Sequence, residues 1–166
     1  SPVLKGKKLD MQDIKHWKGM SKEVVDFRDA TGEEALWTNS MFSGMPAYQI
    51  STKYKGNLIQ YVAKALSLGI PRPANMLFLY LLGFYILLLS LKVDYRLSAV
   101  GAIAFAFSSY FFIIIQAGHM TKAHAIAYVP MVIAAVLYTY RGKMLLGGVL
   151  TALTVSLELY ANHLQI

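Results

Sequence analysis

Residues Gln116–His124 read QAGHMTKAH and form a short polar turn between two long apolar runs, Leu97–Ile115 and Ala125–Tyr138. Two histidines and a lysine stand where a chain that crosses a membrane usually carries a few uncharged residues. The first apolar run, about 19 residues, corresponds to roughly 29 Å of helix, which is enough for the hydrocarbon core of a bilayer. The stretch therefore predicts two membrane helices joined by a polar turn.

The charges divide the chain into two parts. The first 72 residues hold 11 of the 16 Lys and Arg and 7 of the 9 Asp and Glu, and the remainder is almost uncharged. The whole chain is 56% hydrophobic with a mean hydropathy of +0.45, whereas the apolar share of soluble domains is about 45–50%. This division predicts an extramembrane segment, residues 1–72, followed by a membrane segment, residues 73–166.

The membrane segment contains four apolar runs. A backbone inside lipid must satisfy its own hydrogen bonds, so we expect an all-α, multi-pass protein. The four transmembrane helices are expected at Asn75–Leu91, Leu97–Ile115, Ala123–Tyr140 and Met144–Tyr160. Pro130 lies inside the third run, where membrane helices tolerate a kink.

Two helices are expected in the first 72 residues. Asp10–Ala30 has helical periodicity, and Asp10 or Asp13 is a candidate cap for its start. Asn57–Leu68 is amphipathic and too short to span a bilayer, which predicts a juxtamembrane helix along the membrane surface. Glu33–Thr52 lies between them and predicts a loop rich in aromatic residues.

Both ends of the sequence predict a fragment. The basic stretch Ser1–Leu9 is typical of a segment that leaves a membrane helix, and Gln165-Ile166 stops within an apolar pattern. No signal peptide is recognisable at the start. We therefore expect the chain to be truncated at both ends. The chain has no cysteine, which excludes disulfides and thiolate metal sites.

Basic residues in the short loops predict the orientation, because loops rich in Lys and Arg stay in the cytoplasm. Lys92–Arg96 and Arg141–Lys143 together carry four basic residues, whereas Gln116–Lys122 carries one. The latter turn and residues 1–72 are then extracytoplasmic. The basic residues are mixed with acids or flank apolar runs, so we expect membrane lipids as partners and no nucleic acid.

Two aspartates near the start of the chain are candidate catalytic residues. Asp13 or Asp10 would act as a general base at the membrane surface and take a proton from an incoming hydroxyl group. The alternative role for either residue is an N-cap of the following helix.

The polar turn offers candidate ligands for a phosphate group. His119, Lys122 and His124 supply a cation and hydrogen-bond donors, which a phosphate on a lipid carrier requires. One alternative is a solvated turn with Lys122 reaching to the membrane interface. Zinc is a third interpretation, which the histidine spacing does not itself indicate. We predict no resident metal or cofactor, although a divalent cation is compatible with the sequence.

Glu158 lies inside an apolar run near its outer end, where an ionisable residue is a functional candidate. Asn162 and His163 follow within about one turn and are expected to line the same cavity. The alternative for Glu158 is a pairing with Lys122 or a histidine that holds helices together. Trp37 belongs to the aromatic loop, and it either stacks on a sugar or lipid or packs the loop onto the membrane interface.

On these residues the chain resembles the YfhO family of bacterial membrane proteins. The resemblance covers essentially the whole chain but only the N-terminal part of such a protein. It rests on family-level patterns at Ser1–Leu4, Gln12–Trp17, Leu36–Phe42, Gly44–Tyr48, Ala104–Ile115, Gly118-His119, Lys122–Ala127 and Tyr160–His163.

The resemblance implies a glycosyltransferase fold of the GT-C type in the bacterial cytoplasmic (inner) membrane. Such enzymes move a sugar from a polyprenyl-phosphate donor to a glycan or lipid acceptor outside the cytoplasm. Their first extracytoplasmic loop carries an acidic residue, and Asp13 matches that position best, with Asp10 as the fallback. Lys122, with His119 or His124, would hold the donor phosphate. The alternatives are a transporter or flippase for a lipid-linked glycan and a non-catalytic membrane scaffold.

Overall fold

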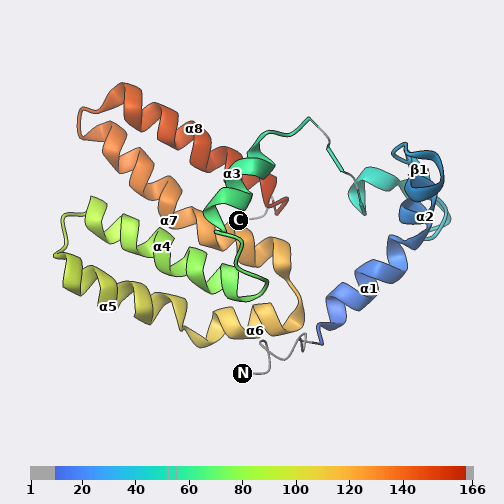
Figure 1. The fold of residues 1–166 in the computed structure, drawn as a ribbon, viewed down its shortest axis with the longest axis horizontal. Helices are drawn as coiled ribbons and strands as arrows, with labels where there is room; N and C mark the ends of the chain where they lie inside the picture. The colour runs from blue at the N-terminus through green and yellow to red at the C-terminus, as the bar shows by residue number, and fades with distance from the viewer. Residues whose placement is uncertain (1–9, 52, 55, 164–166) are drawn as a thin grey trace. The chain divides into compact units, whose positions relative to one another are not determined.

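The computed structural model describes residues 10–51, 53, 54 and 56–163. These residues form eight α-helices, one short 3-10 helix and a two-stranded sheet (Figure 1). The expected all-α class is confirmed as a mainly helical fold. The predicted membrane exit at Ser1–Leu9 lies outside the described residues.

The chain divides into two compact units. Unit 1 is the part up to Asn57 together with Gln116–Gly118, and unit 2 comprises Leu58–Ile115 and the chain from His119 onward. The amphipathic helix after Asn57, which the charge distribution groups with the first 72 residues, therefore clusters with the apolar helices of unit 2.

Unit 1 begins with two helices instead of the single one predicted for Asp10–Ala30. Helix α1 spans Gln12–Met20 and helix α2 spans Lys22–Thr31. Ser21 separates them and is both the C-cap of α1 and the N-cap of α2, with 2% of its surface exposed. Serine has a lower helix propensity than alanine or leucine, which agrees with the break, and the Ser21 side chain makes no capping hydrogen bond. Gly32 ends α2 in the left-handed conformation, at a φ of 74°.

A small hairpin follows in the predicted aromatic loop. Strand β1, Trp37–Thr38, pairs in antiparallel fashion with strand β2, Met45–Pro46, and the 3-10 helix η1, Ala47–Gln49, comes next. The carboxylate of Glu23 in α2 accepts hydrogen bonds from the Thr38 hydroxyl at 2.7 Å and from the backbone N–H after it at 3.1 Å. The hairpin is thus fixed to α2.

Unit 2 contains the remaining helices. They are α3 (Ile59–Leu66), α4 (Ala74–Ser90), α5 (Tyr95–Ala106), α6 (Ser109–Ala117), α7 (Met120–Tyr140) and α8 (Met144–Tyr160). Helix α4 packs between α5 and α7, α8 packs on the other side of α7, and α3 contacts α8 (Figure 1).

The prediction of one helix over Leu97–Ile115 is wrong. Helices α5 and α6 are separated at Phe107 and Ser108, and their axes differ by 43°. Sharp changes of helix direction occur at Gly and Ser pairs, because these side chains offer the backbone alternative hydrogen bonds. Ser108 and Ser109 form such a pair.

Small residues bring the helices of unit 2 close together. A Cβ atom on Gly83 of α4 would lie 2.8 Å from the backbone oxygen of Ala127 in α7, and one on Gly147 of α8 would lie 2.6 Å from the Cα of Thr139. The Tyr80 hydroxyl donates a 2.9 Å hydrogen bond to the backbone oxygen of Ala123. These contacts set the register in which α4, α7 and α8 face one another.

The lengths of the apolar helices decide which could cross a bilayer alone. Helix α7 is long and apolar enough, and α5 with α6 qualifies only if the bent pair is counted as one span. Helices α4 and α8 are apolar but have 17 residues each, the lower limit of about 17 for a transmembrane helix.

Candidate functional site

In unit 1, Asp13 lies against the polar turn that the sequence singled out. Gly118 has a φ of 98°, and a Cβ placed on it would be 3.2 Å from the Cβ atoms of Asp13 and Met11. Only glycine combines this backbone conformation with so close an approach. The first turn of α1 and the residue directly before His119 are therefore in contact.

Neither aspartate caps α1, so the capping prediction is wrong. The N-cap residue is Met11, which makes no side-chain capping bond, and Asp13 lies in the first turn. An acidic residue there interacts favourably with the helix dipole. Asp10 forms an exposed ion pair with Lys15, with 2.6 Å between Oδ1 and Nζ, and such surface pairs contribute little to stability.

Trp37 has a structural environment within the hairpin. Its indole N–H donates to the Asn39 side-chain oxygen at 3.2 Å, and Gly44 packs against the ring so closely that a Cβ would lie 2.7 Å from it. The side chain is still 56% exposed. The Trp37 ring therefore packs against Gly44 within the loop, and its Nε1–H is already bonded to Asn39.

The loop tip beside Trp37 carries backbone strain that the sequence did not indicate. Phe42 and Ser43 both have positive φ values, 51° and 59°, and the Phe42 side chain is 82% exposed. Two consecutive non-glycine residues in this conformation persist only when the surroundings hold them.

The structure separates the three candidate phosphate ligands. His119 is the N-cap residue of α7, and the ammonium group of Lys122 lies 5.5 Å from the centre of the Tyr110 ring in α6. Nδ1 of His124 lies 3.0 Å from the backbone oxygen of Met120. Because a carbonyl only accepts, Nδ1 carries the proton of that bond. Two residues along a helix turn its face by about 200°, so Lys122 and His124 point to different sides of α7.

His124 instead shares a helix face with Tyr128, which lies one turn further along α7. Thr139 of α7 contacts Gly147 of α8. Tyr128 lies about three turns from Thr139 along α7, and Glu158 lies about three turns from Gly147 along α8. Since three turns restore the same face, Tyr128 and Glu158 face one another across the helix pair.

Glu158 has no hydrogen-bond partner among the described residues, although both its carboxylate oxygens are inaccessible to water. The same holds for the side-chain oxygen of Asn75 in the first turn of α4, a residue that is 5% exposed. The predicted alternative for Glu158, a pairing with Lys122 or a histidine, is not found within the described part of the chain.

Arg72 is exposed and lies just before α4. It makes no ion pair with any described acidic residue. The sequence reading missed Tyr128, although its four-residue spacing from His124 places both residues on one face of α7.

Asn162 and His163 follow the end of α8. Asn162 has a φ of 57°, a conformation that asparagine adopts more readily than most residues, and its N–H bonds to the backbone oxygen of Leu159 at 3.0 Å. Asn162 therefore has a local role in ending the helix, and His163 is half-buried beside it.

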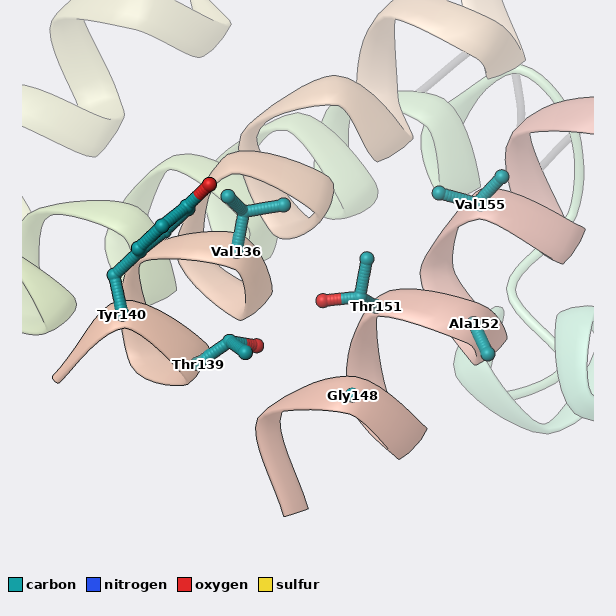
Figure 2. Close-up of a pocket in the computed structure, with 7 residues that line it drawn as sticks. All are labelled: Val136, Thr139, Tyr140, Gly148, Thr151, Ala152 and Val155. Atoms are coloured by element: carbon teal, nitrogen blue, oxygen red, sulfur yellow. The ribbon is translucent and has the colours of Figure 1, made fainter. Parts of the chain in front are cut away.

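A groove of about 500 Å³ lies at the opposite end of the α7–α8 pair, away from these groups (Figure 2). The hydroxyls of Thr139 and Thr151 in its wall donate to backbone oxygens of their own helices. The two threonine hydroxyls are thus already bonded, and the wall is otherwise apolar apart from the Tyr140 hydroxyl, which is the character of a helix-packing or lipid-facing surface. Its lining residues are Val136, Thr139, Tyr140, Gly148, Thr151, Ala152 and Val155.

Comparison with protein-family models, with curated proteins and with solved structures finds no match to this chain. Within the described residues, no three or more His, Asp or Glu side chains gather as a metal-binding group.

Proposed function

We propose that unit 2 is embedded in a bacterial cytoplasmic membrane as part of a multi-pass protein. The support is the surface of its helices, where large apolar side chains face outward. Leu97 and Ile113 are 62% and 63% exposed, and Leu145 is 85% exposed. Extended apolar surfaces of this kind are rare on soluble monomers and mark contact with lipid or a partner. Lipid covers all the outer faces at once.

We propose further that the protein is a glycosyltransferase of the GT-C type that uses a polyprenyl-phosphate-linked sugar. The observation that carries this proposal is the position of His124, Tyr128 and Glu158 toward one end of the α7–α8 pair, in an otherwise apolar helical unit. Ionisable groups among apolar helices are costly and mark functional sites. Asp13, which contacts the polar turn within unit 1, supplies a carboxylate for acid–base chemistry.

The proposed reaction is a displacement at the anomeric carbon of the donor sugar. The acceptor hydroxyl oxygen bonds to that carbon while the bond from the carbon to the phosphate oxygen breaks. Asp13 takes the hydroxyl proton, and polyprenyl phosphate leaves with the bonding electrons.

The test uses the full-length protein in membranes supplied with polyprenyl-phosphate sugars. Asp13→Asn should abolish transfer while donor binding survives, because the amide keeps the shape of the side chain and loses its basicity. Asp29→Asn, an exposed acid in α2, is the matched control. Transfer that persists in Asp13→Asn removes the catalytic assignment.

A transporter or flippase for a lipid-linked glycan is the second candidate. The observation that favours it is Glu158, a carboxylate without a partner between helices, because polar groups at such positions line transport pathways. The two functions differ in their products. A flippase moves the intact donor between leaflets of a vesicle and leaves its sugar–phosphate bond unbroken, and it is insensitive to Asp13→Asn.

A further inference from the structure

The groove between α7 and α8 begins beside the loop that joins these two helices. Its lining includes Tyr140, the last residue of α7, and Gly148, at the start of the second turn of α8. The lining extends to Val155, which lies about 10 Å further along α8. Side chains of both helices form the walls (Figure 2). A Cβ placed on Gly148 would meet nothing within 4 Å, so the absent side chain leaves the groove open at this point.

The wall of this groove fits a hydrocarbon chain better than a polar ligand. The hydroxyls of Thr139 and Thr151 donate to backbone oxygens of their own helices, at 3.0 and 2.8 Å respectively. Apart from the Tyr140 hydroxyl, the remaining lining is apolar. The volume of about 500 Å³ lies in the range of about 300–1,000 Å³ that is typical of small-molecule sites. A hydrocarbon chain that fills the groove gains the dispersion contacts that an empty groove lacks.

Two cations stand at the loop end of the groove. Arg141 directly follows Tyr140 and caps the end of α7, and Lys143 is the N-cap residue of α8. Both are exposed, and neither forms an ion pair with an acidic residue in the described part of the chain. Only Gly142 separates them, so the loop carries no acid of its own. A ligand that fits both the groove and this loop has an apolar chain and an anionic head.

We propose that the α7–α8 groove binds an anionic phospholipid, with one acyl chain in the groove and the phosphate beside Arg141 and Lys143. This inference rests on the membrane location of unit 2 in the proposed function and not on the transfer reaction. Basic pockets between membrane helices bind anionic lipid headgroups at the cytoplasmic surface, the side predicted for this loop. The small residues Gly148 and Ala152 would also admit another helix, but a helix needs no cations at the loop. A phospholipid accounts for the apolar groove and the cations together.

The first test measures lipid binding to the full-length protein in detergent by native mass spectrometry. The probes are phosphatidylglycerol, which is anionic, and phosphatidylcholine with the same acyl chains, which has no net charge. The wild type should bind phosphatidylglycerol roughly tenfold more tightly, and the double variant Arg141→Gln/Lys143→Gln should bind both lipids equally. The matched control is Lys92→Gln/Arg96→Gln, which removes the same charge where α4 connects to α5 and should keep the preference.

The second test fills the groove and leaves the cations in place. Gly148→Leu should weaken binding of both lipids by roughly tenfold, because the new side chain occupies the space of the acyl chain. Its melting temperature should stay that of the wild type, since nothing lies within 4 Å of a Cβ at this position. Ala152→Leu, in the same lining, should repeat the result. Ala99→Leu, at an exposed position of α5, is the control and should bind both lipids normally.

The outcomes separate the lipid site from the proposed function. A wild type that binds both lipids equally, or an equal loss of preference in the two double variants, overturns the lipid site. If Gly148→Leu keeps its lipid but dissociates an oligomer, the groove holds a helix of another copy, and the proposal is likewise overturned. A wild type that does not fractionate with membranes removes the membrane location, and the site fails with it. Absence of sugar transfer, by contrast, removes the glycosyltransferase proposal and leaves the lipid site intact.

Discussion

Arg28 in unit 1 and Glu158 in unit 2 are both charged side chains shielded from water, but their surroundings differ. Arg28 is 8% exposed and forms two hydrogen bonds with Glu34, at 2.8 and 2.7 Å, and a third with the backbone oxygen of Ser51 at 3.1 Å. Glu158 has no hydrogen-bond partner among the described residues. A fully bonded charge specifies a fold, whereas an unbonded one costs stability and is expected where a ligand uses it.

The same contrast extends to what holds each unit together. Hydrogen bonds from side chains fix the hairpin of unit 1 to α2, with Glu23 bonded to Thr38 and Arg28 to Glu34. Unit 2 relies on close backbone contacts at Gly83 and Gly147. Substitutions that separate polar bonding from backbone packing therefore test the comparison directly.

The largest effect is expected from Gly147→Leu. Its side chain meets the backbone of Thr139 at 2.6 Å, so α7 and α8 must move apart, and overpacking of this kind costs typically about 1–3 kcal/mol or more. The measurement is the thermal midpoint and the yield of folded protein in detergent. Gly148→Leu is the control, because nothing lies within 4 Å of a Cβ at that position. Equal losses in both variants contradict the packing argument.

Arg28→Gln and Glu158→Gln should change stability in different directions. Removing the Arg28 guanidinium leaves Glu34 without its main partner, so unit 1 should melt lower, by on the order of 5 °C. Glu158→Gln removes a group that has no hydrogen-bond partner among residues 10–51, 53, 54 and 56–163, and it should leave the melting temperature unchanged or raise it. Intrinsic tryptophan fluorescence follows unit 1, because both tryptophans of the chain, Trp17 and Trp37, lie there. A marked fall for Glu158→Gln means that the carboxylate is bonded after all.

Sequence reasoning found the helices where one local signal dominates. Uninterrupted apolar runs predicted α4, α7 and α8 closely. It failed at Ser21 and at the pair Ser108 and Ser109, where one helix ends and the next begins. Apolar periodicity on both sides of such a residue continues unchanged, so the pattern alone does not show the break.

The candidate site was predictable only in part. Glu158 was identified because its charge is conspicuous in an apolar run, but the packing of α8 on α7 that turns it toward Tyr128 is not visible in either run. The predicted grouping of Lys122 with His124 overlooked the turn of the helix between them. The chemistry of a residue identifies it as a candidate for the site. The helix face on which it lies decides which other candidates it can contact.

A smaller effect is expected from acid. The hydrogen bond from the Thr38 hydroxyl, followed by that from the backbone of Asn39, lowers the pKa of Glu23 below its usual 4.5, and the hydrogen bond from Arg28 lowers the pKa of Glu34. A carboxyl group with a lowered folded-state pKa stabilises the fold fully above its unfolded value. That stabilisation is lost as the pH falls through the folded pKa.

Unit 1 should therefore melt at a lower temperature as the pH falls below about 4.5, as followed by tryptophan fluorescence. Glu23→Gln should be less stable than the wild type at neutral pH and lose less on acidification, because one of the two titrating groups is gone. Glu33→Gln, in an exposed residue, is the control and should follow the wild-type profile. A wild-type profile that stays flat to about pH 3 contradicts the assignment of both carboxylates to the fold.

The smallest change in stability is expected from Phe42→Gly at the strained tip of the hairpin. A left-handed conformation costs a non-glycine residue about 1–2 kcal/mol, while glycine loses about 0.5–1 kcal/mol through its greater freedom when unfolded. Since Phe42 is 82% exposed and buries little, the two terms partly cancel and leave a gain of about 0–1.5 kcal/mol. Chemical denaturation followed by tryptophan fluorescence measures this difference.

Phe42→Ala then separates the aromatic ring from the strain, because alanine retains the unfavourable φ and lacks the ring. If the hairpin only supports unit 1, both variants should retain wild-type sugar transfer in the full-length protein. If the exposed ring contacts a substrate or the membrane, both should lose transfer although Phe42→Gly is at least as stable as the wild type. A loss of transfer in both variants would mean that unit 1 also has a feature that costs stability and serves function. That feature would be the strained, exposed Phe42, as the unbonded Glu158 is in unit 2.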